Sequence, residues 1–424
     1  MNKLFPKRVA VTAVGFVCSI GNDAAEVDAS LRELKNGIEV FPPFDKPECP
    51  IKLAGTIKGF DTGSMDPEDW TYPERYKIKR EVLRGFSPNV MYAYCAMQQA
   101  LEASKLSPEE ISNPDTGMYT ASSGSVHFTY KLLERMHKVG VMRGSPMGVV
   151  SSVVGTLSYN LVAAYKIQGA SCGFASACAS SAHALGMAWD AIASGRQKRM
   201  FVVGAEDGNA DAILPFASMR ALTTNPDPNT ASRPFDKNRN GFVGTGGGAV
   251  LLLEEYESAK ARGADILCEF LGWGQSSDGY NVAISHPEGA GLHRAMQVAL
   301  GEANLKPEQV DYINAHGTST PIGDHSEIVA IKNLFGENAK TAIGSTKAIT
   351  GHGLSLAGAM EAGFCALALK NGYIPGTAHT TEIDEVAASL NIPLKTVEQQ
   401  PNIVMSNSSG FGGANVSLIF GKAN

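Results

Sequence analysis

The stretch GFASACASSAH (residues 173–183) contains the residue around which the chain is organised, Cys178. Cys178 lies among small residues, at a point where a strand would end and a helix begin. Small neighbours leave a thiol uncovered, and a helix start offers free N–H groups and a partial positive charge that favour a thiolate. The alternative is a buried cysteine in a close-packed helix, because free cysteine is among the most buried residue types. Taken alone, this stretch supports both interpretations equally.

The composition of the chain excludes several classes of protein. Its 424 residues, 44% hydrophobic and 18% charged, are typical of a globular protein with two sizeable cores or one large duplicated core. The net charge of -6 argues against a nucleic-acid binder. Seven cysteines without paired spacing indicate reduced thiols in a cytoplasmic protein. We expect no metal site, because CxxC and HExxH are missing, and no membrane partner, because no segment reaches the ~18 to 20 apolar residues of a span.

The first part of the chain alternates apolar strands with helical patterns. Strands are expected over residues 9–17, 116–121 and 200–204, and helices over residues 22–36, 76–104 and 178–194. The pattern of residues 76–104 predicts one long helix that begins with a cluster of basic side chains. This is the densest basic patch in an acidic chain, so it could dock an acidic partner.

A similar order of elements recurs from residue 264 onward. Residues 266–272 match the first strand, 310–315 match 116–121, 342–372 match the Cys178 segment with its helix, and 403–415 match 200–208. The recurrence predicts an α/β chain with two related halves, 1–263 and 264–424, each with buried parallel strands and crossover helices. In such sheets, chemistry gathers where strand ends and helix starts meet.

Two histidine motifs occupy such junctions in the second half. NAHGTSTPIGD (residues 314–324) places His316 just after a strand, and KAITGHGLS (residues 347–355) places His352 where a loop joins a helix. A lone histidine is more often a polar core residue than a catalyst. Both motifs lie at places equivalent to that of Cys178, which favours a site assembled from both halves. The stretch SNSSGFGGAN (residues 406–415) is flexible enough to present backbone N–H groups to that site.

Five motifs together resemble those of the β-ketoacyl-acyl carrier protein synthases, the condensing enzymes of the thiolase superfamily, and most closely the bacterial fatty-acid elongation type. The matching stretches, in the order of the family, are SACASSAH, RPFDKNRNGFVGTGGGA, NAHGTSTPIGD, STKAITGHGLSLAGAMEA and SNSSGFGGAN. The resemblance spans essentially the whole chain. It implies a thiolase-like duplicated βαβαβαββ fold, layered α/β/α/β/α, with the cysteine in the N-terminal half and both histidines in the C-terminal half.

The resemblance also implies a reaction. Cys178 would take an acyl group from the phosphopantetheine thioester of an acyl carrier protein. The N–H groups of Cys178 and Phe411 would form the oxyanion hole. His316 and His352 would stabilise the enolate of malonyl-acyl carrier protein as CO2 leaves, and the carbanion would attack the acyl group. Loss of CO2 would drive this Claisen condensation without a metal or an organic cofactor.

The family assigns supporting roles to further positions of this sequence. By resemblance, Lys347, Asp324, Glu327 and Glu361 form a buried ionic network, Thr318 and Thr320 hold the pantetheine arm, Phe411 is a gate, and Arg84 with Lys79 and Arg80 docks the carrier protein. Two positions concern the acyl chain. Ser409 stands where the family usually has a second Phe, and Gly124 aligns with a pocket position that is small in type I synthases and bulkier in type II. The resemblance therefore leaves the acyl substrate open.

Two alternatives differ from a fatty-acid synthase. A ketosynthase of a specialised polyketide or aryl polyene pathway would use the same chemistry on another chain. A chain-length-factor-like partner would be a non-enzymatic half of a heterodimer, but such partners lack the active cysteine, and Cys178, His316 and His352 are all present. A thiolase acting on coenzyme A would carry a cysteine in place of one histidine. The family is dimeric, so we expect a homodimer, with a heterodimer as the other possibility.

Overall fold

A ten-stranded sheet forms the centre of the computed structural model, which describes residues 7–423. Its strands are β1 (Val9–Val17), β4 (Thr116–Ala121), β5 (Ser171–Phe174), β6 (Arg199–Glu206), β7 (Gly247–Glu255), β8 (Cys268–Ser277), β9 (Tyr312–Asn314), β10 (Ala342–Gly344), β11 (Ile403–Gly410) and β12 (Ala414–Gly421). A separate two-stranded sheet consists of β2 (Ile38–Val40) and β3 (Leu53–Gly55). The order across the large sheet is β10-β9-β11-β12-β8-β1-β7-β6-β4-β5.

The strand order is that of a duplicated fold. The first half runs β5-β4-β6-β7-β1 across the sheet, and the second half runs β10-β9-β11-β12-β8 in the corresponding positions. In each half, the three strands that end at the site pair in parallel: β4 with β5 and β6, and β9 with β10 and β11. The halves join where β1 pairs antiparallel with β8. The recurrence of elements predicted from the sequence is confirmed.

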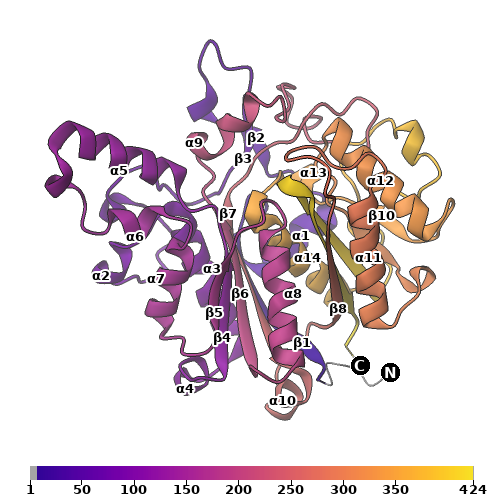
Figure 1. Cartoon of the computed structure of the whole chain (residues 1–424), viewed down its shortest axis with the longest axis horizontal. Coiled ribbons are helices and arrows are strands. Elements are labelled where there is room, and N and C mark those ends of the chain that lie inside the picture. The colour runs from indigo at the N-terminus through magenta and orange to yellow at the C-terminus, as the bar shows by residue number, and fades with distance from the viewer. Residues whose placement is uncertain (1–6, 424) are drawn as a thin grey trace.

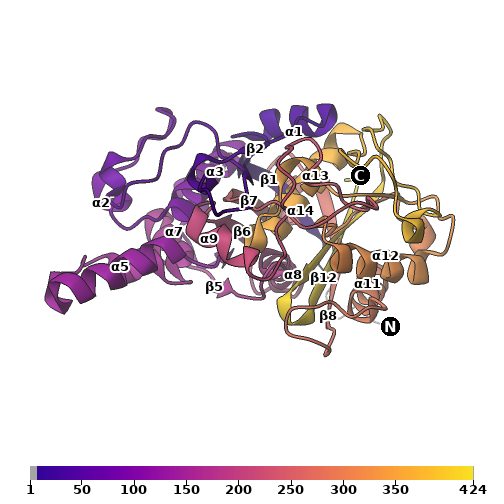
Figure 2. The same cartoon turned by 90° about the horizontal axis from the view of Figure 1, so that it is seen from above.

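Helices separate and cover the two halves of the sheet (Figures 1 and 2). The longer helices are α1 (Ala24–Glu33), α3 (Pro88–Ser104), α5 (Val126–Val139), α7 (Thr156–Tyr165), α8 (Ser180–Ala193), α11 (Ala290–Ala303), α12 (Pro321–Phe335) and α14 (Ala357–Asn371). The shorter ones are α2 (Arg80–Leu83), α4 (Pro108–Ile111), α6 (Gly148–Ser152), α9 (Ala210–Ile213), α10 (Tyr256–Ala261) and α13 (Lys347–Thr350). None of the helices within residues 7–423 has the length and apolar character needed to cross a membrane.

The helices α8 and α14 form the middle layer of the molecule. They pack against each other and against strands of both halves, whereas α3 covers β1, β6 and β7 from one side and α11 covers β8 and β12 from the other. A helix buried on all sides must be apolar around its whole circumference, and every residue of α14 from 357 to 369 is buried. Close approach needs small residues, since a Cβ on Gly358 would lie 2.5 Å from the backbone nitrogen of Ala182. The α/β/α/β/α layering is confirmed.

The basic segment is not one long helix. The expectation of a helix over residues 76–104 is wrong, because the chain forms the short α2, leaves helical geometry, and starts α3 at Pro88. Proline has no N–H for a helical hydrogen bond and is tolerated only in the first turn, so α3 begins where the proline stands. Arg80 and Arg84 therefore lie on a separate exposed turn.

Candidate active site

The turn that carries Cys178 connects β5 to α8. The helix starts at Ser180, two residues after Cys178. Ala177 has a φ of 50°, in the left-handed region that residues with a Cβ rarely adopt. Such backbone strain beside Cys178 persists only where the surrounding structure holds the residue in place. The turn thus presents the thiol at the carboxyl end of a parallel strand.

His352 brings its ring to the thiol from the other half of the chain. Its Nε2 atom lies 3.0 Å from the Sγ atom of Cys178. His316 follows β9, and its ring is perpendicular to that of His352, with the ring centroids 5.2 Å apart. Both histidines are buried, with exposed fractions of 9% for His316 and 3% for His352. The structure therefore brings the three predicted catalytic residues into one group.

Burial controls the protonation of this group. Burial raises the pKa of the Cys178 thiol to about 12, although the charge of Lys347 opposes the shift. Burial and, next, the charge of Lys347 hold the pKa of His316 and of His352 well below 6.5. The resting pair is therefore a neutral thiol beside a neutral imidazole, and the thiolate expected from the helix start alone is not obtained. At this distance, His352 can accept the thiol proton as the sulfur attacks.

A buried ion pair lies behind the histidines. The ammonium group of Lys347 in α13 contacts the carboxylate of Glu361 in α14, and both side chains are fully buried. The carboxylate of Glu327 in α12 accepts the N–H of His316 at 2.9 Å and the N–H of Gly317 at 2.7 Å. These contacts fix the backbone that carries His316, because two of its consecutive N–H groups are bound to the same carboxylate.

Asp324 supports the same loop from its other end. Its carboxylate accepts the N–H of Phe235 at 3.0 Å and the N–H of Ser319 at 3.1 Å, and it lies 3.6 Å from the guanidinium of Arg239. Burial raises the pKa of Asp324 to about 6 in spite of that guanidinium. Asp324 thus holds the loop between His316 and α12, and it takes no part in the ion pair behind the histidines.

A cavity of about 450 Å³ opens over Cys178. The predicted residues that line it are Cys178, His316, His352, Thr318, Thr320, Glu327, Ser409 and Phe411. The hydroxyl oxygens of Thr318 and Thr320 lie 3.0 Å apart on one wall. Other walls are apolar, with Phe216, Phe242 and Leu354. A mostly apolar cavity with a few convergent polar groups is the usual form of a site for an elongated small-molecule group.

The turn between β11 and β12 lines the cavity at Phe411. A Cβ on Gly410 would lie 2.7 Å from the carbonyl oxygen of Ser176 and 3.1 Å from the backbone nitrogen of Cys178, so only glycine allows this approach. The backbone of Phe411 is thereby brought next to that of Cys178. The Phe411 ring is 39% exposed, and its centroid lies 6.1 Å from that of Phe216.

The polar groups beside this turn include Ser409. Its hydroxyl donates to Oδ1 of Asn415 at 2.7 Å, and the Asn415 amide donates to Asp278 at 2.8 Å. The backbone N–H of Asp278 in turn donates to the carbonyl of Gly413 at 2.9 Å. Ser409 is therefore bound into a network that joins the Phe411 turn to the loop after β8.

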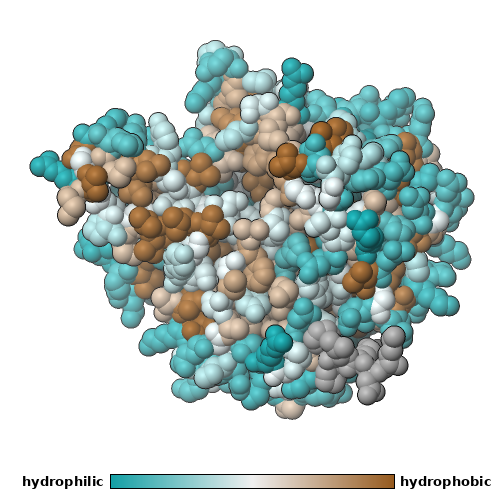
Figure 3. Space-filling model, in the orientation of Figure 1, coloured by the Kyte–Doolittle hydropathy of each residue, from teal (hydrophilic) through white to brown (hydrophobic). Residues whose placement is uncertain are grey.

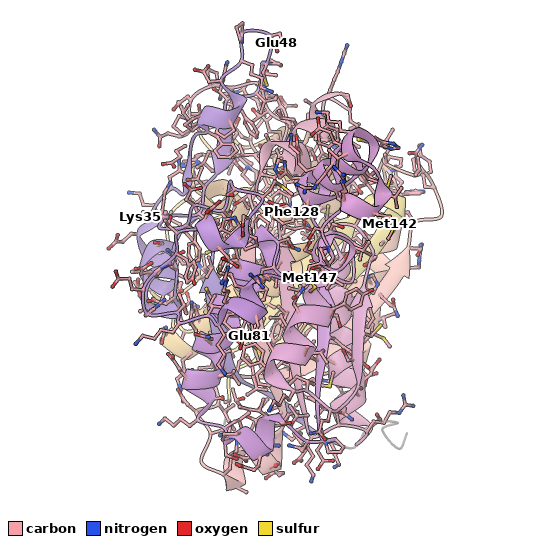
Figure 4. The ribbon with its side chains drawn as sticks, turned by 90° about the vertical axis from the view of Figure 1, so that its left-hand side faces the viewer. Lys35, Glu48, Glu81, Phe128, Met142 and Met147 are labelled. Atoms are coloured by element: carbon pink, nitrogen blue, oxygen red, sulfur yellow. The ribbon has the colours of Figure 1, made fainter. Side chains whose placement is uncertain are left out.

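Gly124 and the basic residues lie outside this cavity. Gly124 has a φ of 78° in the turn after β4, and a Cβ there would lie 2.7 Å from the carbonyl oxygen of Ser152. It does not line the cavity over Cys178, so its role toward the acyl chain stays a prediction. Arg80 and Arg84 line a second cavity of about 960 Å³ between α2 and α5, and the neighbouring Lys79 is exposed. Figure 4 labels Phe128 and Met147 on this face.

Two buried polar residues near the site were missed in the sequence. Asn407 donates to the Glu327 carboxylate at 3.3 Å. Glu206, at the end of β6, accepts the N–H and the hydroxyl of Ser123 at 3.1 and 2.7 Å and the hydroxyl of Ser355. Burial raises the pKa of Glu206 to about 8. The sequence feature that could have identified Glu206 is that it is an acidic residue at the end of an otherwise apolar strand. Within residues 7–423, no His, Cys, Asp and Glu side chains cluster as metal ligands do.

Comparison with known proteins matches both halves of the chain. The family described as "Beta-ketoacyl synthase, N-terminal domain" matches residues 6–259, and "Beta-ketoacyl synthase, C-terminal domain" matches residues 267–381. The "3-oxoacyl-[acyl-carrier-protein] synthase 1" of Haemophilus influenzae is 40% identical over 423 residues, which cover 99% of this chain and 100% of that protein.

Solved structures of similar proteins share the fold. A β-ketoacyl synthase from Burkholderia phymatum STM815 superposes with a TM-score of 0.89 at 34% identity, covering 99% of this chain and 100% of that one. A structure described as "The ishigamide ketosynthase/chain length factor" gives a TM-score of 0.88 at 29% identity, with the same coverage of 99% and 100%.

Proposed function

The chain belongs to the β-ketoacyl synthase family and is an acyltransferase that condenses an acyl chain with malonyl-acyl carrier protein in fatty-acid elongation, and we propose that Cys178 holds the acyl chain while His316 and His352 act on the malonyl group. One observation carries this assignment. The Sγ atom of Cys178 lies 3.0 Å from Nε2 of His352 at the base of a cavity that His316 also lines. No other cysteine among the described residues lies beside a histidine in this way.

The first half-reaction transfers the acyl group. The Cys178 sulfur attacks the thioester carbonyl of acyl-acyl carrier protein while His352 accepts the thiol proton. The negative oxygen of the tetrahedral intermediate is stabilised by the N–H groups of Cys178 and Phe411. The pantetheine sulfur then leaves with the proton from His352. The products are acyl-Cys178 and free carrier-protein thiol, and both histidines are neutral again.

The second half-reaction forms the carbon–carbon bond. The malonyl thioester loses CO2, and the electron pair of the broken bond becomes an enolate. Its oxygen accepts hydrogen bonds from His316 and from His352, which for this step takes the neutral tautomer with its proton on Nε2. Their low pKa values keep both rings neutral, so they donate without adding charge to a closed site. The carbanion attacks the acyl-Cys178 carbonyl, and the cysteine sulfur leaves as a thiolate that takes up one proton from solvent. We propose that these steps need no metal and no organic cofactor.

The pantetheine arm would reach the site along the wall formed by Thr318 and Thr320. Their hydroxyl groups lie 3.0 Å apart on the cavity wall that also carries His316, so they can hydrogen-bond to the amides of the arm. The arm would therefore enter along this wall. Phe411 lines the same cavity, so movement of its ring would control access to the acyl side.

Carrier-protein docking would use the basic groove between α2 and α5. Its lining includes five cationic side chains, Arg80, Arg84, Lys131, Arg135 and Lys138, and the apolar side chains of Phe86, Phe128 and Met147, of which Figure 4 labels the last two. Carrier proteins are acidic, so a cationic lining favours their encounter. Two carboxylates partly neutralise these cations. Glu68 contacts the Nε atoms of Arg80 at 2.6 Å and Arg84 at 2.9 Å, and Glu134 contacts the Nζ atoms of Lys138 at 2.9 Å and Lys131 at 3.4 Å.

A dimer would cover two features of one face. The strand β5 ends the large sheet, and its residues Ser171, Cys172 and Gly173 are exposed. Apolar side chains gather at the left of Figure 3, over the region of α5, α6 and α7, and α7 contacts β5. The exposed apolar side chains within residues 126–159 include Tyr130, Leu133, Val139, Val141, Met142, Val149, Val153, Val154 and Tyr159. An unpaired edge strand beside an apolar patch invites pairing with another chain. We propose that the protein forms a homodimer in the cytoplasm. Measurement of the mass of the native assembly tests this: two copies of this chain support the homodimer, and one copy with a second, chain-length-factor-like chain supports a heterodimer.

The direct test of the activity is a condensation assay. Purified protein given acyl- and malonyl-acyl carrier protein should release CO2 and form β-ketoacyl-acyl carrier protein. Cys178→Ala should form no condensation product. Product formation by Cys178→Ala at the wild-type rate would refute the assignment.

A specialised pathway is the second candidate. Ser409 is a small residue on the cavity wall where the resemblance leads us to expect a bulky Phe, which leaves room for a rigid or long acyl chain. The similarity to the ishigamide ketosynthase is consistent with this possibility. Competition between saturated and polyene acyl-carrier proteins of equal length decides between the two. Preference for the saturated chain supports fatty-acid elongation, and preference for the polyene supports the alternative.

A further inference from the structure

The turn that carries Cys178 is held by a chain of hydrogen bonds that reaches His183. The N–H of Ser176 donates to Oγ of Ser180 at 2.8 Å, and the Ser180 hydroxyl donates to the carbonyl of Ala177 at 2.6 Å. The Ser176 hydroxyl oxygen lies 2.8 Å from Nδ1 of His183. These bonds surround the left-handed Ala177 and thereby hold the strained conformation.

The other ring nitrogen of His183 is fixed from the second half of the chain. Nε2 lies 2.9 Å from Oε1 of Gln275 in β8, and the ring packs edge-on against Trp273 with centroids 6.3 Å apart. Nδ1 also lies 3.2 Å from the carbonyl oxygen of Ala179, but that oxygen already accepts the backbone N–H of His183 at 2.9 Å. The shorter contact is with Gln275, whose amide oxygen only accepts, so the ring proton lies on Nε2 and Nδ1 is the acceptor for the Ser176 hydroxyl. Burial lowers the pKa of His183, which keeps the ring in the neutral form that this arrangement needs.

Ser176 contacts both backbone segments that carry the proposed oxyanion donors, the N–H groups of Cys178 and Phe411. Its carbonyl oxygen accepts the N–H of Ala179 at 3.1 Å within the nucleophile turn. On its other side, it faces the Cα of Gly410, where an added Cβ would lie only 2.7 Å away. A shift of Ser176 would thus move the backbone of Cys178 and that of the neighbouring Phe411 at the same time. Oxyanion stabilisation is sensitive to such shifts, because donors must be aimed at one oxygen atom.

We propose that His183 is a positioning residue for the acylation step, which acts through the Ser176 hydroxyl to hold the N–H groups of Cys178 and Phe411 in the geometry that stabilises the oxyanion. The inference rests on the proposed function, because it needs acylation at Cys178. It adds a residue of the first half whose orientation is set by Gln275 of the second half. His183 itself does not line the cavity over Cys178.

Two isosteric substitutions separate the two ring nitrogens. His183→Asn places an amide oxygen near the position of Nδ1 and so keeps an acceptor for Ser176. His183→Gln places its amide near the position of Nε2 and so keeps the contact with Gln275 but loses Ser176. We expect His183→Gln to slow Cys178 acylation about tenfold and His183→Asn to stay within about threefold of wild type. Ser176→Ala should match His183→Gln, and combining the two should cost nothing further.

The readouts distinguish positioning from folding. Acylation by acyl-acyl carrier protein needs the oxyanion hole, whereas alkylation of Cys178 by iodoacetamide does not. The proposal predicts that His183→Gln loses acylation and keeps wild-type alkylation. Acylation of His183→Gln at the wild-type rate would overturn the proposal, and so would a parallel loss of acylation and alkylation. An acylation rate of His183→Asn as low as that of His183→Gln would overturn it as well. If wild-type protein itself were not acylated at Cys178, the proposed function would fail instead.

Discussion

The Nε2 atom of His352 lies 3.0 Å from the Sγ atom of Cys178, although the two residues are 174 positions apart and belong to different halves of a duplicated fold. Both groups are neutral at rest, because burial raises the pKa of the thiol and lowers that of the imidazole. In the proposed mechanism, this contact lets a buried thiol become a nucleophile, because the proton moves over one hydrogen bond while the sulfur attacks.

The pH dependence of two reactions of Cys178 should differ. Alkylation depends on the thiolate, and the thiol pKa is raised to about 12, so its rate should keep rising through pH 9 without a plateau. Acylation depends on neutral His352, whose pKa lies well below 6.5, so its rate should be flat above pH 6.5. Peptide-resolved alkylation, with the exposed Cys172 as a reference for the reagent, measures the first profile. A plateau of alkylation near pH 7 would contradict the neutral resting thiol.

Substitutions of the two histidines should have different effects on the two partial reactions, acylation and decarboxylation. His316→Ala should lower malonyl decarboxylation about 100-fold while Cys178 is still acylated at the normal rate. His352→Ala should lower both rates, because His352 contacts the thiol as well as facing His316. CO2 release from malonyl-acyl carrier protein and single-turnover acylation measure the two steps. Unimpaired decarboxylation in either variant would remove that histidine from the mechanism.

The ion pair of Lys347 and Glu361 should behave as a unit. Glu361→Leu leaves the ammonium group buried without its partner and should lower the free energy of unfolding by about 3–5 kcal/mol. Adding Lys347→Met should recover most of that loss, because both charges are then removed. Urea unfolding of the two single variants and the double variant gives the coupling energy. Simple additivity of the two losses would show that the pair does not act as a unit.

Glu68 should compete with the carrier protein for Arg80 and Arg84. Glu68→Gln frees both guanidinium groups, so the KM for acyl-carrier protein should fall about two- to fivefold, whereas Arg84→Glu should raise it. A small acyl thioester without a carrier protein serves as the control substrate, and its KM should not change. Equal effects on both substrates would count against docking at this groove.

Glu206 should make the protein less stable as pH rises. Its pKa is raised to about 8 in the folded protein from an ordinary value of 4.5, so the folded state binds more protons than the unfolded state between these values. The contribution of Glu206 to the free energy of unfolding is therefore fully present below pH 4.5 and is lost as pH rises through 8. Glu206→Gln does not titrate, so the Tm of this variant relative to wild type should increase from pH 5 to pH 9. The same Tm difference at both values would contradict the assigned shift.

Much of the fold could be predicted because its strands are continuous apolar runs. Val9–Val17 and Thr116–Ala121 form strands with the expected bounds, and the repeated order of elements led to the duplicated sheet. The prediction of one long helix over residues 76–104 was wrong at Pro88, where the missing N–H of proline outweighs the helical periodicity. The boundary between residues 263 and 264 stays a prediction.

The group of Cys178, His316 and His352 could be predicted because its motifs stand at strand ends and resemble those of a known family, but its protonation could not. Whether Cys178 is a thiol or a thiolate depends on burial by residues far away in the sequence. The partners of His183 were equally hidden, since Gln275 lies 92 positions away. Glu68 and its two arginines likewise meet only through the path of the loop between them. Contacts of this kind follow from tertiary packing and leave no local pattern.

Mass spectrometry of the intact protein after incubation with acyl-carrier proteins of graded chain length tests the central claim most directly. The account predicts one added acyl group per chain, located on the peptide that contains Cys178 and released when malonyl-acyl carrier protein is added. The chain length that gives the fastest labelling then defines the acyl substrate. An acyl group on another residue, or none in wild-type protein under conditions that yield condensation product, would contradict the account.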